Sequence, residues 1–578
     1  MSGRATHQDA GTAGASPRLD SWKEIAAYLK RGVRTVRRWE RQEGLPVRRH
    51  IHGKQATVYA FSQEIDEWLK GRSAQEGAAW VHPVHAPQAS SWPGSETDLK
   101  EKRTGPAVIA ILPLRFLGGD LAYERGERFA DGLTDELIME IGHTCPKYLR
   151  VIALTSVMQY KQSPKSIAQI GQELGADYIL EGAIRRDGQR VRLTARLIAA
   201  RDETHIWANS YEIQLPPILS LQQSLARQVA DSLSLRFHAG PRKRRHPATA
   251  LKFAAHSTYI EGRSHFLPTP GDSTKSIEQL NLAIVEDPKF APSYAQLALA
   301  YLRRVFWDYP PIVTCRRIEE NASQALKLDP KLALAHSMLA AFHLFSAWAW
   351  PKAERETRKA IKLNPSDAWA HLVRAAYHLV VGELRDAIEE LKSVRQLDPQ
   401  SAETGLWFAI FAYFARRYDL GIEHCQDLLQ IAPSSAPVHL RLAFGLAMTG
   451  EHALALSHCE KARELGDVYG QQVPIACAIY ALAGERELAE RLLQELVVAE
   501  DHQYTRYFFL AAASVSLGKD QETLDWLEKA FKQRDPLLIF LRTDPMFEPV
   551  AGLSGFRNLL RRIGLPEIPR RLAATQPG

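Results

Sequence analysis

Four arginines near the start of the chain are spaced so that they share one face of a helix: Arg34, Arg37, Arg38 and Arg41. The segment VRTVRRWERQ that carries them predicts a helix with an apolar opposite face. Guanidinium groups on such a face can pair with guanine edges in a DNA major groove or neutralise phosphates. The pattern therefore favours contact with double-stranded DNA, and Thr35 on the same predicted helix is a further candidate contact.

Positive charge is concentrated around this predicted helix. Between Lys30 and Lys54 there are nine Lys or Arg side chains and two carboxylates, a net charge of +7 that equals the formal net charge of all 578 residues. Arg48, Arg49 and Lys54 lie on a segment that predicts a two-stranded ribbon turning near Gly53. Two other interpretations stay open: the arginines form a merely solvated helix face, or the module has lost DNA binding and binds protein.

The neighbouring segments supply the elements that would position these side chains. In chain order they are SWKEIAAYL, RTVRRWE, GLPV, the ribbon and EIDEWL. Over about 50 residues this order resembles the winged helix-turn-helix of the MerR and excisionase type. The resemblance implies that the RTVRRWE helix enters the major groove and that the ribbon, as a wing, contacts the DNA backbone or minor groove. Gly32 stands where such proteins usually carry a Ser cap, a small departure.

Composition predicts a folded, multidomain, mostly α protein, because 45% of the residues are hydrophobic and 24% are charged. No run of 18 apolar residues and no secretion signal is present, so we expect a cytoplasmic protein without a membrane segment. Five widely spaced cysteines predict reduced, buried thiols. Composition changes predict these parts: a disordered tail (1–18), the winged domain (19–70), a flexible linker (71–106), an α/β domain (107–240), helical repeats (250–536), a C-terminal cap (537–567) and a tail (568–578).

The middle part predicts the order βαβαβββα. The apolar run VIAILPL predicts a strand buried on both faces, followed by a helix at 128–141 and a second strand at 150–156. A helix at SIAQIGQELG, a hairpin turning at Asp187-Gly188, a last strand and a closing helix at 218–237 complete it. Over about 130 residues, through IAILPL, FADGLTDELI and IGQELGADYILEGAIRR, the segment resembles the TolB amino-terminal-like domain. The resemblance implies a binding or assembly unit rather than an enzyme.

The carboxylates of the predicted 128–141 helix are the main argument for catalysis. Asp131 and Asp135 would share a helical face next to Glu136, so an acid/base pair is conceivable. The alternative, which we favour, is that they stabilise a helix start, with Thr134 as a polar surface group. No phosphate-loop, nucleophile-elbow or zinc-protease motif occurs, and the twenty histidines form no ligand set. We therefore expect no enzyme activity, no cofactor and no metal.

A period of 34 residues dominates the remainder, marked by Pro365, Pro399 and Pro433 and by glycines in another phase. This is the period of the tetratricopeptide repeat, a stacked helix pair, and it predicts an α-solenoid of about eight repeats. Small residues fall where the first helix of each pair crosses its partner: Ala298, Ala341, Ala375, Ala409, Ala443, Cys477 and Ala511.

The position after each small residue usually looks into the groove of such a superhelix. Here it is mostly apolar, and Phe342, Ile410 and Phe444 are the bulky candidates for contact with a protein or peptide partner. Self-packing of the superhelix is the alternative. The sequence thus predicts a homodimeric DNA-binding regulator with a repeat-based sensing or interaction module. The alternative is a scaffold whose helix-turn-helix module no longer binds DNA.

Overall fold

The computed structural model describes most of the chain beyond the first hundred residues and parts of what precedes it. The described residues are 18–19, 21–29, 36, 40, 45–52, 55–66, 106–117, 123–144, 149–187, 190–214, 253–264, 273–307, 311–466, 472–499 and 507–565. The predicted tails and linker fall almost wholly outside these ranges, and the predicted closing helix at 218–237 falls entirely outside them. The chain divides into two units, residues 1–102 and 103–578, which are described separately.

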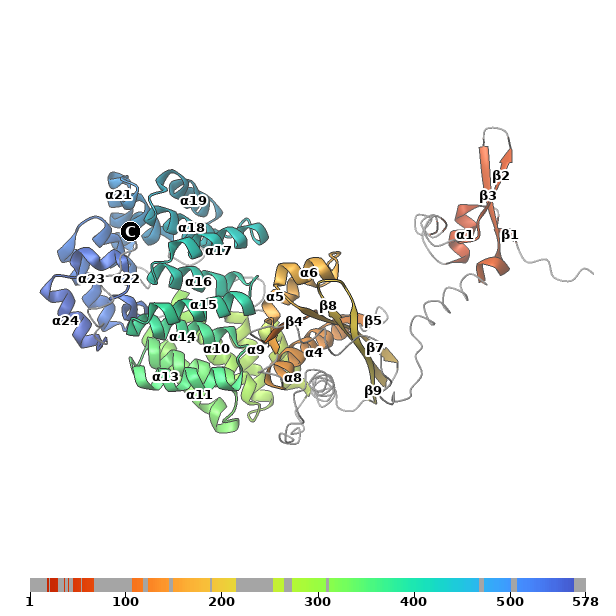
Figure 1. Cartoon of the computed structure of the whole chain (residues 1–578), viewed down its shortest axis with the longest axis horizontal. Helices are drawn as coiled ribbons and strands as arrows, with labels where there is room; N and C mark the ends of the chain where they lie inside the picture. Colours follow the sequence, from red (N-terminus) through yellow and green to blue (C-terminus); the bar gives the residue numbers. More distant parts are fainter. Residues whose placement is uncertain are drawn as a thin grey trace, which may run out of the picture. The chain divides into compact units, whose positions relative to one another are not determined.

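Unit 1 contains a small antiparallel sheet and a capped helix (Figure 1). Its described elements are β1 (Arg18–Leu19), α1 (Trp22–Tyr28), β2 (Arg48–His52) and β3 (Gln55–Phe61). The predicted ribbon is present, because β2 and β3 pair from Arg48 opposite Tyr59 to His52 opposite Gln55. Strand β1, which the sequence did not predict, pairs with β3 on its other edge.

Apolar side chains from separate segments of unit 1 form one core. Ser21 begins α1 by accepting a hydrogen bond from the Glu24 backbone N–H, so Ile25 is placed inward and fully buried. Val36, from the predicted arginine-bearing helix, and Ile65, near the end of the described part of the unit, are also fully buried. The burial of Val36 agrees with the apolar face predicted for the VRTVRRWERQ segment.

Unit 2 begins with a mixed sheet between two helical layers (Figure 1). The strand order is β6-β4-β7-β8-β9, with β5 also paired to β7. Strands β4 and β6 run parallel, as do β4 and β7, whereas β7, β8 and β9 are antiparallel. The elements are β4 (Ala107–Ile111), β5 (Arg115–Leu117), α4 (Tyr123–Thr144), β6 (Leu149–Val151), α5 (Leu154–Val157), η3 (Met158–Tyr160), α6 (Ile167–Leu174), β7 (Tyr178–Asp187), β8 (Arg190–Ala199) and β9 (His205–Gln214).

Strand β4 is buried on both faces, as its continuous apolar run predicts. Ile109 and Ile111 pack with α4, whereas Val108 and Ala110 pack on the other face with α5 and α6. The predicted helix SIAQIGQELG is also confirmed: α6 begins after a capping box at Ser166 and ends at the left-handed Gly175.

Two predictions for this domain were wrong. The expected strand at 150–156 ends at Val151, and the chain turns into helix α5 at Leu154. The predicted helix at 128–141 begins five residues earlier, at Tyr123. The strand ends early where the chain contacts the repeats, because the Ala153 backbone N–H donates to the Leu397 carbonyl at 2.7 Å.

The predicted solenoid is confirmed, since the described helices of residues 253–532 form eight antiparallel pairs (Figure 1). The pairs are α8 (Phe253–Ser264) with α9 (Ser273–Glu286), α10 (Ala291–Trp307) with α11 (Pro311–Leu328), α12 (Ala333–Phe345) with α13 (Trp350–Leu363), α14 (Ala368–Val381) with α15 (Leu384–Leu397), α16 (Ala402–Phe414) with α17 (Tyr418–Ile431), α18 (Ala436–Met448) with α19 (His452–Leu465), α20 (Gln472–Leu482) with α21 (Arg486–Ala499), and α22 (Tyr507–Ser516) with α23 (Asp520–Lys532). From α10 onward, each first helix also contacts the next first helix, which makes these helices one layer of the superhelix.

The periodic residues have clear structural roles. The small residues predicted at the helix crossings are all buried: Ala298, Ala341, Ala375, Ala409, Ala443, Cys477 and Ala511. Gly450 and Gly484 each come just after the first helix of a pair, and their φ angles are 85° and 90°. Glycine recurs at this position of the repeat because it adopts such positive φ angles without steric strain. The described cysteines are free and buried, as predicted: Cys315, Cys425, Cys459 and Cys477.

The C-terminal segment packs along the first-helix layer as well as against the last pair. It consists of two short 3₁₀ helices and a final helix: η4 (Pro536–Phe540), η5 (Pro545–Val550) and α24 (Ser554–Ile563). The fully buried Phe540 ring stacks on Phe414, with centroids 4.5 Å apart, and lies 6.4 Å from Phe345 of α12. The Trp350 indole N–H donates to the Gly564 carbonyl at 2.7 Å. The chain's own end therefore occupies part of the inner surface.

Candidate functional site

The predicted DNA-contacting residues of unit 1 are only partly within the described residues. Arg48 is the first residue of β2, and its side chain is 53% exposed. Its guanidinium contacts a carboxylate oxygen of Glu64 at 2.5 Å and lies 5.4 Å from the centre of the Phe61 ring. Arg49 lies next to it on the strand, although its side chain is outside the described part. The other predicted contacts also lie outside it: Arg34, Thr35, Arg37, Arg38, Arg41 and Lys54.

Arg48 consequently has a structural role that the sequence did not reveal. Its partner Glu64 lies sixteen residues away and is brought close only by the fold. Because this ion pair already neutralises part of the charge, Arg48 offers less to a phosphate than an unpaired cation would. Arg18 of β1 adds a further cation to the sheet, 4.1 Å from the centre of the Tyr59 ring.

The carboxylates of α4 belong to ion pairs rather than to an acid/base pair. Lys161 lies between Asp131, at 2.7 Å, and Glu127, at 2.8 Å. Asp135 is buried and forms an ion pair with Arg263 of α8. Two residues predicted to share one face thus pair with different cations on different elements.

The expectation that these residues mark a helix start was wrong. Helix α4 begins at Tyr123, so Asp131 is more than two turns inside it. Thr134, expected at the surface, is fully buried. Its hydroxyl accepts from the Leu114 backbone N–H and donates to the Ala130 carbonyl, so it ties the helix to the segment between β4 and β5.

A second connection joins the α/β domain to the repeats at the turn between α15 and α16. Asp398 is buried there, and one of its carboxylate oxygens accepts from Thr155 at 2.5 Å and Ser156 at 2.7 Å, both in α5. The other oxygen accepts from Thr404 at 3.0 Å. Burial raises the pKa of Asp398, and these hydroxyl bonds oppose the rise. The sequence gave no sign of this anchor, because its partners are about 240 residues apart.

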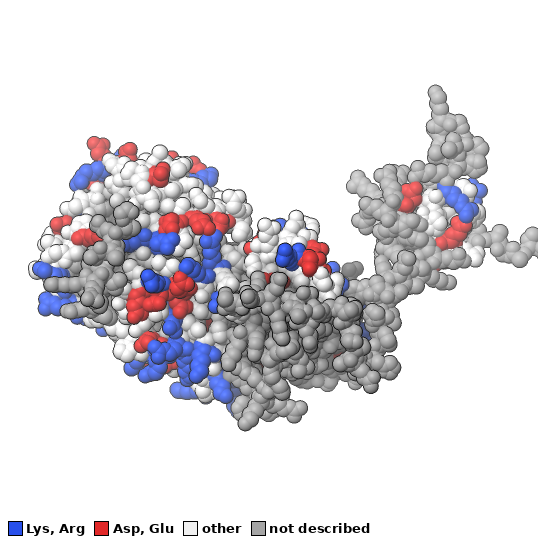
Figure 2. All heavy atoms as spheres, in the orientation of Figure 1, with Lys and Arg blue, Asp and Glu red and all other residues white. Residues whose placement is uncertain are grey.

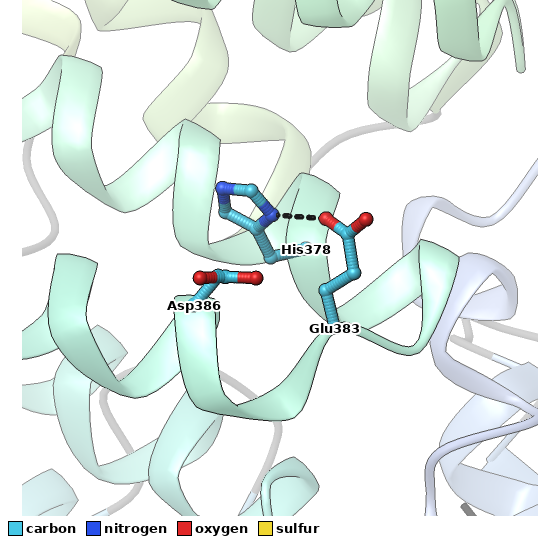
Figure 3. Close-up of side chains that lie close together, drawn as sticks. All are labelled: His378, Glu383 and Asp386. Atoms are coloured by element: carbon cyan, nitrogen blue, oxygen red, sulfur yellow. Dashed lines mark hydrogen bonds and ion pairs between the residues drawn. The ribbon is translucent and has the colours of Figure 1, made fainter. Parts of the chain in front are cut away.

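Among the described residues, one histidine and two carboxylates come close enough to be considered as a metal site: His378, Glu383 and Asp386 (Figure 3). Their potential ligand atoms lie within 4.8 Å of one another. However, His378 Nδ1 is 2.7 Å from Glu383, and its Nε2 accepts from Arg374 at 3.2 Å. Both ring nitrogens are therefore engaged within the protein, and the group is better described as a hydrogen-bonded helix end.

Two of the three predicted groove residues come together, and the third does not join them. Ile410 of α16 and Phe444 of α18 line a cavity of about 60 Å³. The C-terminal segment contributes Asp544 and Met546 to the same cavity. Phe342 of α12 packs, partly buried, against the repeat core and is not part of this lining. The sequence missed Arg441, which also lines the cavity and falls one helical turn before Phe444.

None of the helices in the described part of the chain combines the length and apolarity that a bilayer crossing requires.

Comparison with known proteins gives a family match for the α/β domain alone. Residues 106–228 match the model of the HilA/YgeH-like transcriptional regulator, second domain. A curated relative, "Putative adenylate cyclase 3" of Rhizobium meliloti strain 1021, is 27% identical over 259 residues. The match covers 42% of this chain, and the chain spans 43% of the length of that relative.

Solved structures with helical repeats are similar at low scores. Yeast Tom70 gives a TM-score of 0.33 at 14% identity, covering 60% of this chain and 76% of Tom70. A tetratricopeptide repeat protein from Parabacteroides merdae gives 0.31 at 17% identity, covering 45% of this chain and 98% of that protein. At these scores, the repeat assignment rests on the helix pairs of the chain itself. The chain therefore combines a domain similar to one of a transcriptional regulator with a solenoid of tetratricopeptide type.

Proposed function

We propose that this chain is a bacterial DNA-binding transcriptional regulator whose repeats sense or recruit another molecule. The observation that carries the proposal is the match of residues 106–228 to a domain of a transcriptional regulator, directly following a unit with a +7 segment of 25 residues. A domain that is the second one in such a regulator implies a first domain with a different function. The basic unit 1 is suited to DNA binding, because the affinity of proteins for DNA comes largely from cations placed against phosphates.

In this proposal, unit 1 is a winged helix-turn-helix of the MerR and excisionase type. Arg34, Thr35, Arg37, Arg38 and Arg41 lie in the major groove, while Arg49 and Lys54 on the wing contact the backbone or minor groove. The β2–β3 ribbon, with its described pairing, supports the wing assignment. The middle domain is of the TolB amino-terminal-like type and assembles the molecule, and no catalytic step or cofactor is assigned to it.

One such module contacts a short site, so the proposal includes a dimer that binds two half-sites about one helical turn apart. The repeats take up a protein, a peptide or a small effector. The competing proposal is a scaffold that has lost DNA binding, and it predicts protein partners without a DNA site.

Selection of genomic fragments by the purified full-length chain tests the proposal. A regulator enriches a small set of fragments that share a sequence, and a competitor of random DNA does not displace them at physiological salt. Recovery of random fragments only, all released by moderate salt, would overturn it and favour the scaffold. Lys23→Ala, which removes one charge from an exposed position of α1 outside the set of predicted DNA contacts, serves as a control.

A further inference from the structure

Helix α13 carries the most basic surface among the second helices of the eight pairs. Its 14 residues include five cations and only two carboxylates, and one of these carboxylates, Glu356, is buried. The cations all lie at exposed positions: Lys352, Arg355, Arg358, Lys359 and Lys362. Figure 2 shows basic side chains gathered over this part of unit 2, where α11 and α13 lie in Figure 1. These five residues form a stripe of positive charge, which we call the α13 stripe.

The other repeats show that the solenoid does not require these cations. Because the period is 34 residues, each position of the α13 stripe has an equivalent in α15, α17, α19, α21 and α23. At the five equivalent positions, α15 has a single cation, α17 has none, and none of the later helices has more than two. Asp386 and Glu389 of α15 even stand where α13 has Lys352 and Arg355. Helix packing therefore does not explain the charge of α13.

The protein neutralises only part of this charge. Arg358 forms an ion pair with Glu354, and the Arg355 Nε lies 3.3 Å from a carboxylate oxygen of Glu356. The side chains of both arginines stay mostly exposed, at 69% and 67%. Among the described residues, three ammonium groups of the stripe have no ion-pair or hydrogen-bond partner: those of Lys352, Lys359 and Lys362.

The neighbouring helix α12 gives a second indication that the charge of the stripe is not cancelled. Burial lowers the pKa of His343 in α12, and the charge of Lys352 lowers it further. Glu356 opposes this effect less strongly than Lys352 produces it, and Arg355 adds to the lowering. The positive charge of α13 thus acts on groups around it.

The length of the stripe matches a segment of DNA backbone. At a rise of 1.5 Å per residue, the ten residues from Lys352 to Lys362 span about 15 Å. Each strand of a DNA duplex has one phosphate per about 3.4 Å of the helix axis, so about four phosphates can lie beside the stripe. Side chains spaced by three, four and seven residues share one helix face, so all five cations can reach the same strand.

We propose that the α13 stripe binds the phosphate backbone of the DNA duplex that unit 1 recognises, as a second and sequence-independent contact. The inference rests on the proposed function for the identity of this polyanion. Because both units belong to one chain, DNA held by unit 1 is present near α13 at a high effective concentration. An acidic protein surface lacks this advantage, and we therefore favour DNA.

The test is a salt titration of the full-length chain on its selected fragment and on random DNA. In the stripe variant, Lys352→Gln, Lys359→Gln and Lys362→Gln are combined. It should flatten the log–log salt slope by about two to three units on both DNAs, because each lost phosphate contact contributes about 0.9. Affinity at physiological salt should fall about ten- to hundredfold on both, since phosphate contacts carry no sequence information.

A matched variant removes the same charge elsewhere in unit 2. It combines Arg385→Gln, Lys392→Gln and Lys461→Gln, at exposed positions of α15 and α19. This variant should keep the salt slope of the parent chain, because its cations lie outside the stripe. Glutamine forms helices about as well as lysine, and thermal melting of both variants checks that the fold is kept.

A second measurement uses the unaltered chain. Lysines in contact with phosphates react more slowly with an acetylating reagent, and mass spectrometry reads the rate at each lysine. Bound DNA should slow acetylation of Lys352, Lys359 and Lys362 at least about threefold, while Lys392 and Lys461 react as before.

Equal salt slopes of the stripe variant and the parent chain, or equal acetylation of the stripe with and without DNA, would overturn the proposal. An acidic protein surface would then be the better partner for α13. Failure of the proposed function gives a different result, namely no sequence-specific complex. A stripe variant that still flattens the slope on random DNA in that case would support the α13 contact by itself.

Discussion

The two units of this chain treat positive charge in opposite ways. In unit 1, the segment from Lys30 to Lys54 carries nine cations and only two carboxylates, so local pairing cannot neutralise it. In unit 2, cations are interspersed with carboxylates over the repeats, as the face in Figure 2 shows. Many of them form pairs, such as Arg395 with Glu423 and Asp427, or Arg562 with Glu528.

This difference separates charge that holds the structure together from charge that is left for a partner. Paired cations in unit 2 join helices within and between repeats, whereas an unneutralised basic segment gains most from a polyanion. Arg441 in unit 2, which is partly buried, likewise has a carboxylate near it, because its charge opposes the rise that burial causes in the pKa of Asp544. The excess positive charge in unit 1 thus points to a polyanion such as DNA.

The largest expected effect is on DNA affinity. Replacing Arg34, Arg37, Arg38 and Arg41 together by Gln should weaken binding to the selected site roughly a thousandfold at physiological salt, since several phosphate or base contacts are lost. Fluorescence anisotropy with labelled DNA measures it, and Lys23→Ala should change affinity only slightly. A similarly small loss of DNA affinity in both variants would contradict the idea that the charge of the predicted arginine face is used for DNA binding.

The next effect concerns the buried anchor between the α/β domain and the repeats. Asp398→Ala should lower the free energy of unfolding of unit 2 by about 3 kcal/mol, because the buried hydroxyls of Ser156 and Thr404 and the partly buried hydroxyl of Thr155 lose their acceptor. Denaturant titration measures this change. Asp398→Asn should recover part of the loss, and the exposed Asp386→Ala should stay within about 0.5 kcal/mol of the parent chain. Equal stability of all three variants would contradict a structural role for this charge.

A pH dependence follows from Asp544. Burial raises the pKa of this carboxyl from 3.8 to about 6. The folded state therefore holds its proton more tightly than the unfolded state, and the resulting stability is present below about pH 4 and lost as pH rises through 6. Asp544→Asn, which keeps an acceptor oxygen, should gain up to about 3 kcal/mol relative to the parent chain between pH 4 and pH 7. A constant difference between the two proteins across this range would show that Asp544 titrates normally.

The smallest effect sharpens the comparison inside unit 1. Lys54→Ala should reduce the log–log salt slope of DNA binding by about one unit if it removes one phosphate contact. Arg48→Ala should reduce it by less, because the Arg48 guanidinium already contacts Glu64. Salt titrations of both variants on the same DNA decide the point, and a larger slope change for Arg48 would show that DNA displaces the ion pair.

Periodic features of the molecule could be predicted from the sequence, whereas long-range ones could not. The 34-residue period correctly predicted that residues such as Ala341 and Ala443 lie at buried helix crossings, because the two helices of every repeat pack against each other in the same way. The apolar run of β4 likewise predicted burial on both faces. These are patterns within one element or between neighbours.

The errors and omissions arise where distant segments meet. The sequence makes Thr134 look like a surface residue, because its partner Leu114 comes from the segment between β4 and β5. Asp398 looks like an ordinary turn residue, because only the fold places α5 beside it. Arg441 looks like any helix-surface arginine, because only the aromatic enclosure from several repeats and the C-terminal segment reveals its setting. Spacing alone carries no information about such contacts.

The most direct test of the central claim is a salt titration of the full-length chain on its best selected fragment and on random DNA of equal length. The account predicts a site-specific complex that survives physiological salt and is at least about a thousandfold tighter than the complex with random DNA. Weak binding, equal on both DNAs and lost at moderate salt, would contradict it, because charge alone would then explain every contact of unit 1.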